Sequence, residues 1–231
     1  MWGVLPMSFM KLPKIFLFDL DGVILDTESV YLKLMIKYNK KNNMPITRKF
    51  YIDNFIGKTK KDINNYYEKK YKYEFNTNQY WDDLIKLRDD YFKYYGVKIK
   101  KGFLSLIKYL KNNNYKIGLI TSNSKKLTLK LLITAGLKID DFDVIITRED
   151  VINTKPFPDL YLKAIEYFNA DNNDFIAIED SNVGIQSALN AKIQVIYLKD
   201  IDVVKTKLKK ECFKCIKTLD EAISILEELK P

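Results

Sequence analysis

Two aspartates stand close together directly after an apolar run near the start of the chain. Residues 15–18 (Ile-Phe-Leu-Phe) are followed at once by Asp19 and Asp21, with Gly22 behind them. Carboxylates this close repel each other, and a divalent cation such as Mg²⁺ or a shared proton relieves the repulsion. A carboxylate is also ionised at neutral pH, so one can act as a nucleophile in phosphoryl transfer while the other serves as acid and base. The spacing indicates a candidate catalytic pair; the alternative is a solvated acidic turn.

The apolar run in front of the aspartates predicts the element that positions them. Four large apolar residues without alternation are typical of a short strand that is buried on both faces of a parallel sheet. Both carboxylates would emerge at the carboxyl end of this strand, where Gly22 lets the chain turn. Ligands of open α/β sheets bind at that edge. We therefore expect the site at the carboxyl edge of a sheet.

Two later segments carry groups that can bind a phosphoryl oxygen. The apolar run 117–120 ends in Thr121 and Ser122, whose hydroxyls stand where a helix is expected to begin. Such a strand end presents O–H and N–H groups to an anion, although the same residue types also begin ordinary helices. Lys155 lies in a segment with prolines at 156 and 158, and a lysine held by a rigid turn can neutralise phosphate charge beside Asp19.

A further apolar run, residues 175–178, again ends in acid, namely Glu179 and Asp180. Carboxylate oxygens are the hard ligands that Mg²⁺ prefers. We therefore expect these two residues to share a cation with Asp19 and Asp21. A surface acidic pair is the alternative for this segment considered alone.

Taken in chain order, the four segments resemble the four motifs of the haloacid dehalogenase superfamily. Residues 19–27 are similar to the first motif of its β-phosphoglucomutase-like phosphatase branch, and residues 121–123, 154–161 and 179–185 are similar to the second, third and fourth motifs. The resemblance implies an α/β fold with a Rossmann-like parallel sheet core. It also implies Mg²⁺-dependent phosphoryl transfer through an aspartyl-phosphate.

The resemblance assigns a role to each matched residue. Asp19 would be the nucleophile and Asp21 the acid and base, and Thr121, Ser122 and Lys155 would bind the phosphoryl group. The metal ligands would be Asp19, Asp21 (through its backbone carbonyl), Glu179 and Asp180.

The pattern of residues 29–96 predicts an inserted all-helical domain of four helices. The core would then comprise residues 1–28 and 97–231. The third helix is expected at about 60–71 and the fourth after Thr77 as N-cap, with Trp81, Leu84, Ile85 and Tyr95 on its apolar side.

In the resembled family this domain is a cap that closes over the nucleophile and selects the substrate. Its candidate substrate contacts here are Lys58, Lys60 and Arg88, and ordinary solvated side chains are the alternative.

The resemblance favours a phosphatase of small phosphorylated metabolites, with sugar phosphates as the expected class. The first alternative is a β-phosphoglucomutase-type mutase. That enzyme has a histidine in its first cap helix where this chain has Tyr31, and a cap lysine where this chain has Leu87. Both departures favour hydrolysis. A non-catalytic binding protein is a further alternative, and the intact catalytic positions argue against it.

Composition narrows the remaining classes of function. The 231 residues are 47% hydrophobic and carry a net charge of +9, but the lysines are scattered and no reader motif accompanies them, so we expect no nucleic-acid partner. No run reaches membrane-spanning length, so we expect no membrane partner. The chain has no histidine, so catalysis must use carboxylates, hydroxyls and lysines. A monomer is compatible with the sequence, which leaves the oligomeric state open.

Two further features concern the thiols and the N-terminus. Cys212 and Cys215 form a C-x-x-C with no other Cys or His to complete a zinc site. We expect no redox role for this pair, and the cysteine usage fits a protein of the reducing cytoplasm. The first dozen residues are expected to form a loosely packed extension, with Met7 and Met10 as alternative starts.

Overall fold

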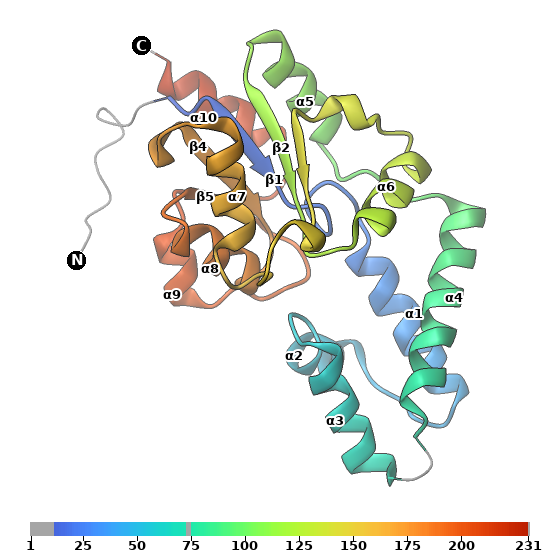
Figure 1. The fold of residues 1–231 in the computed structure, drawn as a ribbon. Coiled ribbons are helices and arrows are strands. Elements are labelled where there is room, and N and C mark those ends of the chain that lie inside the picture. The colour runs from blue at the N-terminus through green and yellow to red at the C-terminus, as the bar shows by residue number, and fades with distance from the viewer. Residues whose placement is uncertain (1–11, 73–74, 231) are drawn as a thin grey trace. The chain divides into compact units, whose positions relative to one another are not determined.

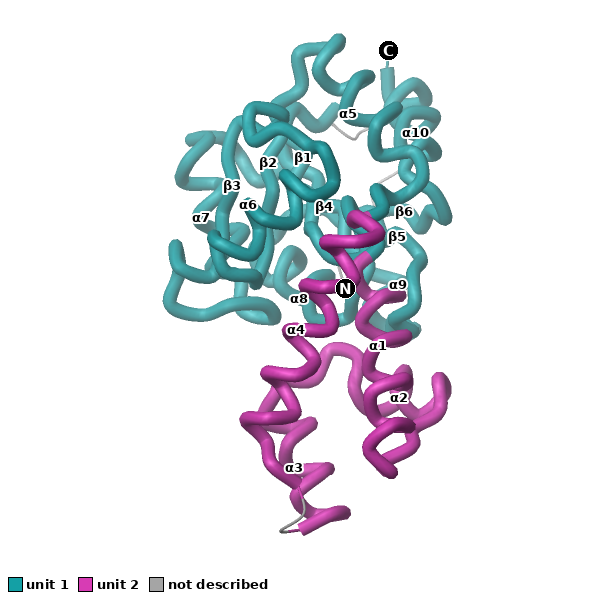
Figure 2. The backbone as a smooth tube through the Cα atoms, turned by 90° about the vertical axis from the view of Figure 1, so that its right-hand side faces the viewer, with its two compact units in different colours: residues 1–26, 98–231 teal, residues 27–97 magenta. Residues whose placement is uncertain are grey.

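The computed structural model describes residues 12–72 and 75–230, so the predicted N-terminal extension lies almost entirely outside the described residues. The described chain divides into two compact units, residues 1–26 with 98–231 and residues 27–97 (Figure 2). Within the described ranges, no helix combines the length and the apolar composition that crossing a lipid bilayer requires.

The first unit is built on a six-stranded parallel sheet with the strand order β3-β2-β1-β4-β5-β6 (Figure 1). Phe18 at the end of β1 pairs with Leu119 on one side and with Ile178 on the other, so the residues that follow these strands meet at one edge. The order reverses between β1 and β4, which is where such sheets bind ligands. The strands are β1 (Ile15–Phe18), β2 (Lys116–Ile120), β3 (Val144–Ile146), β4 (Phe175–Glu179), β5 (Gln194–Leu198) and β6 (Lys214–Ile216).

Helices cover both faces of this sheet, as the unbroken apolar run of β1 predicted. Leu17 belongs to the core that the sheet forms with Leu160 of α7 and Ile185 of α8. The next residue, Phe18, points to the opposite face and meets the ring of Phe103 in α5 edge-on, with centroids 5.6 Å apart. The predicted α/β class with a Rossmann-like parallel sheet is confirmed. The helices of this unit are α5 (Phe103–Asn112), α6 (Lys125–Thr134), α7 (Asp159–Phe168), α8 (Asn182–Asn190), α9 (Thr206–Glu211) and α10 (Glu221–Leu229).

The second unit consists of four helices around an aromatic core. Tyr67 and Tyr80 are almost fully buried, and the ring of Phe75 stacks on Tyr67 with centroids 4.9 Å apart. The buried amide of Asn39 donates to the hydroxyl of Tyr80, which donates in turn to Tyr67. The helices are α1 (Glu28–Lys41), α2 (Arg48–Asn54), α3 (Lys60–Tyr71) and α4 (Thr77–Tyr95).

Two local expectations for α4 are wrong. The helix begins at Thr77 itself, and the N-cap is Asn76, whose side chain accepts a hydrogen bond from Gln79 N at 3.1 Å. Ile85 and Tyr95 are exposed, whereas Tyr80, Leu84 and Phe92 are buried. Successive helical residues are turned by about 100°, so burial of Leu84 carries the adjacent Ile85 off the buried face.

The two segments that leave and re-enter the first unit pair with each other. Asp26 N donates to Lys98 O and Lys100 N donates to Ile24 O, each at 2.9 Å, around an antiparallel bridge between Leu25 and Ile99. This pairing fixes Lys100 relative to the turn that follows Asp19.

Candidate active site

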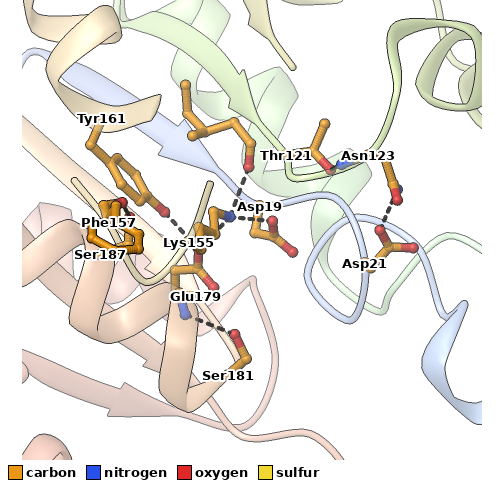
Figure 3. A network of polar contacts seen from close by, with 12 residues as sticks. Asp19, Asp21, Thr121, Asn123, Lys155, Phe157, Tyr161, Glu179, Ser181 and Ser187 are labelled. Carbon is orange, nitrogen blue, oxygen red and sulfur yellow. Dashed lines mark hydrogen bonds and ion pairs between the residues drawn. The ribbon is translucent and has the colours of Figure 1, made fainter. Parts of the chain in front are cut away.

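Asp19 lies at the end of β1 and is held there by backbone and side-chain contacts. Its N–H donates to the carbonyl of Ile178 in β4 at 3.1 Å, which continues the sheet by one residue. The Lys155 ammonium contacts Asp19 Oδ1, lies 2.6 Å from Glu179 Oε1, and donates to the carbonyl of Ile120 at 2.9 Å (Figure 3). The structure thus brings together three residues from separate predicted segments.

The segment that carries Lys155 is fixed by α8. Ser187 donates through Oγ to Phe157 O at 2.5 Å, and Asn190 donates through Nδ2 to Pro156 O at 3.2 Å. The side chain of Lys155 itself is only 5% exposed. Its ammonium group is placed beside the nucleophile candidate by backbone contacts as well as by charge.

Burial and charge act in opposite directions on Lys155 and Glu179. Burial lowers the pKa of Lys155, but the carboxylates of Asp19 and Glu179 outweigh it and raise that pKa above its ordinary value. Burial raises the pKa of Glu179 to about 7 against the opposing effect of Lys155, and Asp19 adds to the rise. Lys155 therefore remains cationic at neutral pH, and the uncompensated charge of the cluster is negative.

Tyr161 is a site residue to which the sequence alone assigns no role. Its hydroxyl donates to Glu179 Oε1 at 2.7 Å, and its side chain is fully buried. Its signal in the sequence is a tyrosine on the buried face of a helix, because a buried phenol requires a hydrogen-bond partner. Tyr161 thus holds the carboxylate of Glu179 through a buried hydrogen bond.

Asp19, Glu179 and Asp180 form a group whose carboxylate oxygens lie within 4.8 Å of one another, and all three side chains are buried. Glu179 Oε2 is buried and accepts no hydrogen bond from any described residue. Such an oxygen needs a partner, and a divalent cation supplies one. The donor set consists of hard oxygen ligands only, so these residues fit Mg²⁺.

Two glycines make room for these carboxylates. Gly22 has φ +79°, and a Cβ there would lie 2.0 Å from Asp180 Oδ2. A Cβ at Gly184, in the first turn of α8, would lie 1.9 Å from Glu179 Oε2. Any larger residue at either position would displace a carboxylate of the group.

Asp21 lies apart from this group of three and has a different partner. Asn123 donates through Nδ2 to Asp21 Oδ2 at 2.5 Å (Figure 3), and Asn123 N donates to the hydroxyl oxygen of Thr121 at 3.1 Å. The buried Thr121 follows β2 directly, so the structure places its hydroxyl at the same edge as Asp19. Asn123 belongs to the second motif, but the sequence assigns it no role, because its partner stands 102 residues away in the chain.

The other residues predicted to contact phosphate or substrate are either exposed or paired within their own helix. Ser122 is exposed. Lys58 and Lys60 are exposed as well, and the Lys60 ammonium lies 4.9 Å from the ring centroid of Trp81. Arg88 is paired within its own helix, with Nη2 2.7 Å from Asp89 Oδ1 and its side chain 15% exposed.

Cys212 and Cys215 are free thiols, and burial raises the pKa of Cys212 to about 12.

Comparison with known proteins places this site in context. The chain is 25% identical over 185 residues to "Phosphorylated carbohydrates phosphatase" of Thermotoga maritima, which covers 78% of this chain and 82% of that protein. It is 24% identical over 184 residues to "Pyrophosphatase PpaX" of Bacillus cereus, covering 76% and 78%. The β-phosphoglucomutase of Clostridium difficile shares the fold, with a TM-score of 0.73, 24% identity, and coverage of 94% and 96%.

The sequence pattern of the family described as haloacid dehalogenase-like hydrolase matches residues 16–198, which run from the second residue of β1 to the end of β5 and include every core residue of the site described above. This chain is a member of the haloacid dehalogenase-like hydrolases.

Proposed function

We propose that the chain is a Mg²⁺-dependent phosphatase that hydrolyses small phosphorylated metabolites, with sugar phosphates as the expected class, through a phosphorylated Asp19. The observation that carries the proposal is the buried lysine that contacts two carboxylates of a three-carboxylate group at the switch point of the sheet. A nucleophile, a cationic group for the phosphoryl oxygens and a cation site are thereby available within one cluster. The named phosphatase relative supports the substrate class.

Asp19, Glu179 and Asp180 would hold the cation together with the backbone carbonyl of Asp21. Bound Mg²⁺ would neutralise phosphate charge and orient the phosphoryl group. In the first half of the reaction Asp19 attacks phosphorus, the bond to the leaving oxygen breaks, and Asp21 donates its proton to that oxygen. In the second half Asp21 takes a proton from water, which attacks the phosphorus and frees Asp19 and inorganic phosphate.

The remaining residues stabilise and orient the reacting groups. Lys155 remains charged at neutral pH and would bind phosphoryl oxygens with the hydroxyl of Thr121. Asn123 holds the Asp21 carboxylate through a hydrogen bond, which would set the direction in which Asp21 delivers its proton. Ser122 in the core and Lys58, Lys60 and Arg88 in the second unit complete the proposed set of phosphate and substrate contacts.

A phosphosugar mutase is the second candidate, and the shared fold with β-phosphoglucomutase favours it. A mutase returns the phosphoryl group to a sugar hydroxyl, whereas a phosphatase delivers it to water. Where the mutase has a histidine and a lysine in its cap, this chain has Tyr31 and Leu87. The absence of that histidine and that lysine favours hydrolysis.

The test is phosphate release from a panel of sugar phosphates, nucleotides and pyrophosphate, with and without Mg²⁺, for the wild type and Asp19→Asn. Release that requires both Mg²⁺ and Asp19 supports the proposal, and the order of the substrates defines the specificity. Conversion of β-glucose 1-phosphate to glucose 6-phosphate after priming with a bisphosphate, without net phosphate release, would replace it by the mutase.

A further inference from the structure

A second, partly buried pair of opposite charges lies next to the carboxylate group, and neither of its residues belongs to the four motifs. Lys100 Nζ lies 2.6 Å from Asp200 Oδ1, and the two side chains are 18% and 11% exposed. Partial removal of two such charges from water is unfavourable, so the pair needs close compensation from its surroundings. The neighbours of Asp200 indicate what the pair does.

Asp200 reaches the site from the loop that follows β5. This strand neighbours β4 and runs parallel to it, so both end at the edge that carries Asp180. A Cβ at Gly22 would lie 2.0 Å from Asp180 Oδ2 and 3.0 Å from Asp200 Oδ2. The two carboxylates therefore flank the same glycine. Asp200 Oδ2 is buried and accepts no hydrogen bond from any described residue.

Lys100 is held in place by the paired connecting segments of the first unit. Its N–H donates to the carbonyl of Ile24 at 2.9 Å, next to the bridge between Leu25 and Ile99. Two carboxylates that flank the same glycine are close enough to repel each other. The Lys100 ammonium, 2.6 Å from Asp200 Oδ1, offsets this repulsion and holds Asp200 beside Asp180.

We propose that Asp200 is a positioning residue for the cation site, whose Oδ2 accepts a hydrogen bond from the hydration shell of the divalent cation. Lys100 holds Asp200 in that place through its other carboxylate oxygen. The inference rests on the proposed Mg²⁺ site and adds a carboxylate that no motif contains. Hydrogen-bonding partners of this kind commonly change metal affinity by about 10- to 100-fold.

The first test is isothermal titration of Mg²⁺ into the full-length Asp200→Asn variant. We expect Mg²⁺ to bind about tenfold more weakly than to the wild type. The Mg²⁺ concentration that gives half-maximal phosphate release should rise by the same factor. Glu166→Gln is the matched control, because it removes the same charge from an exposed pair with Lys163 and should leave Mg²⁺ affinity unchanged.

A second variant covers the case in which Asp200→Asn leaves Lys100 unpaired and the protein unfolds. The double variant Lys100→Met with Asp200→Asn removes both charges of the pair, and it should also bind Mg²⁺ about tenfold more weakly. If either folded variant binds Mg²⁺ as tightly as the wild type, the pair is only a structural link to the connecting segments and the inference is wrong.

Asp180→Asn separates failure of this inference from failure of the proposed function. Loss of Mg²⁺ binding in Asp180→Asn, with unchanged binding in Asp200→Asn, overturns only the role of Asp200. Absence of Mg²⁺ binding in the wild type overturns the cation site itself, and with it the role of Asp200.

Discussion

Lys155 joins the charges of the candidate site into one cluster. Its ammonium contacts Asp19, lies 2.6 Å from Glu179, and donates to the carbonyl of Ile120. With 5% of its side chain exposed, little solvent screens these contacts. The same lysine therefore compensates buried carboxylates in the free protein and is available to a phosphoryl group in the reaction.

Replacement of Lys155 by methionine should affect both stability and activity. The change leaves Asp19 and Glu179 buried without their cation, which should cost about 3–5 kcal/mol in the free energy of unfolding. Phosphate release should fall by about 10²–10³-fold in kcat, because a preorganised charge beside the phosphoryl group is lost. Denaturant unfolding and steady-state kinetics measure the two effects. An active Lys155→Met variant would show that the lysine has only a structural role.

The raised pKa of Glu179 predicts how Mg²⁺ binding depends on pH. Burial raises this pKa to about 7, so the folded protein holds this proton more tightly than the unfolded chain does. The protonated carboxyl stabilises the metal-free fold at low pH, and this contribution is lost as the pH rises through about 7. Because Mg²⁺ competes with that proton, its affinity should fall as the pH drops.

Titration calorimetry at about pH 6 and about pH 8 measures this effect, and we expect Mg²⁺ affinity to be several-fold lower at the acid value. Glu179→Gln is the control, because it removes the titrating group and should flatten the dependence. Equal affinities at both pH values for the wild type would show that Glu179 does not exchange a proton for the cation.

At the scale of the elements, parallel strands carry the site to one edge. The side chains of Asp19, Thr121 and Asp180 come from segments far apart in the sequence, and they meet because β1 is paired with both β2 and β4. Helix α8 then closes the cluster, since its first turn lies against the carboxylate of Glu179.

Gly184→Ala separates the requirements of the helix from those of the site. Alanine in a helix is favoured over glycine by about 1 kcal/mol, so propensity alone predicts a more stable protein. The new Cβ would lie 1.9 Å from Glu179 Oε2, however, and must displace that carboxylate. We expect Mg²⁺ affinity to fall at least about tenfold.

Gln186→Ala, on the same helix, is the matched control for Gly184→Ala and should leave Mg²⁺ affinity unchanged. Titration calorimetry and thermal unfolding compare the two variants. A Gly184→Ala protein that is more stable and binds Mg²⁺ normally would contradict the close approach seen in the structure.

At the scale of the whole molecule, the sequence was sufficient to predict the parallel sheet and the residues that lie at its carboxyl edge. The unbroken apolar runs before Asp19, Thr121 and Glu179 predicted buried parallel strands, and each run proved to be a strand. Their order along the chain, with the resemblance of the motifs, predicted which side chains share the edge. These features are local in sequence, so spacing and composition reveal them.

The contacts that sequence did not reveal are those that arise only from tertiary structure. The hydrogen bond from Asn123 to Asp21 and the ion pair of Lys100 with Asp200 each join residues about a hundred positions apart. No local pattern predicts such a partner. The buried side of α4 was also misjudged in part, because which of several apolar residues faces inward depends on the packing of the other helices.

The chemical step at Asp19 is the central claim, and trapping the acyl phosphate tests it most directly. The wild type is mixed with Mg²⁺ and the best substrate of the panel, quenched in acid during turnover, and reduced with borohydride, which converts an acyl phosphate of aspartate to homoserine. Peptide mass spectrometry then reads the residue at each position. We predict homoserine at position 19 alone, only with substrate and Mg²⁺, and none in Asp19→Asn. Phosphate release with unmodified Asp19, or by Asp19→Asn at the wild-type rate, would contradict the account.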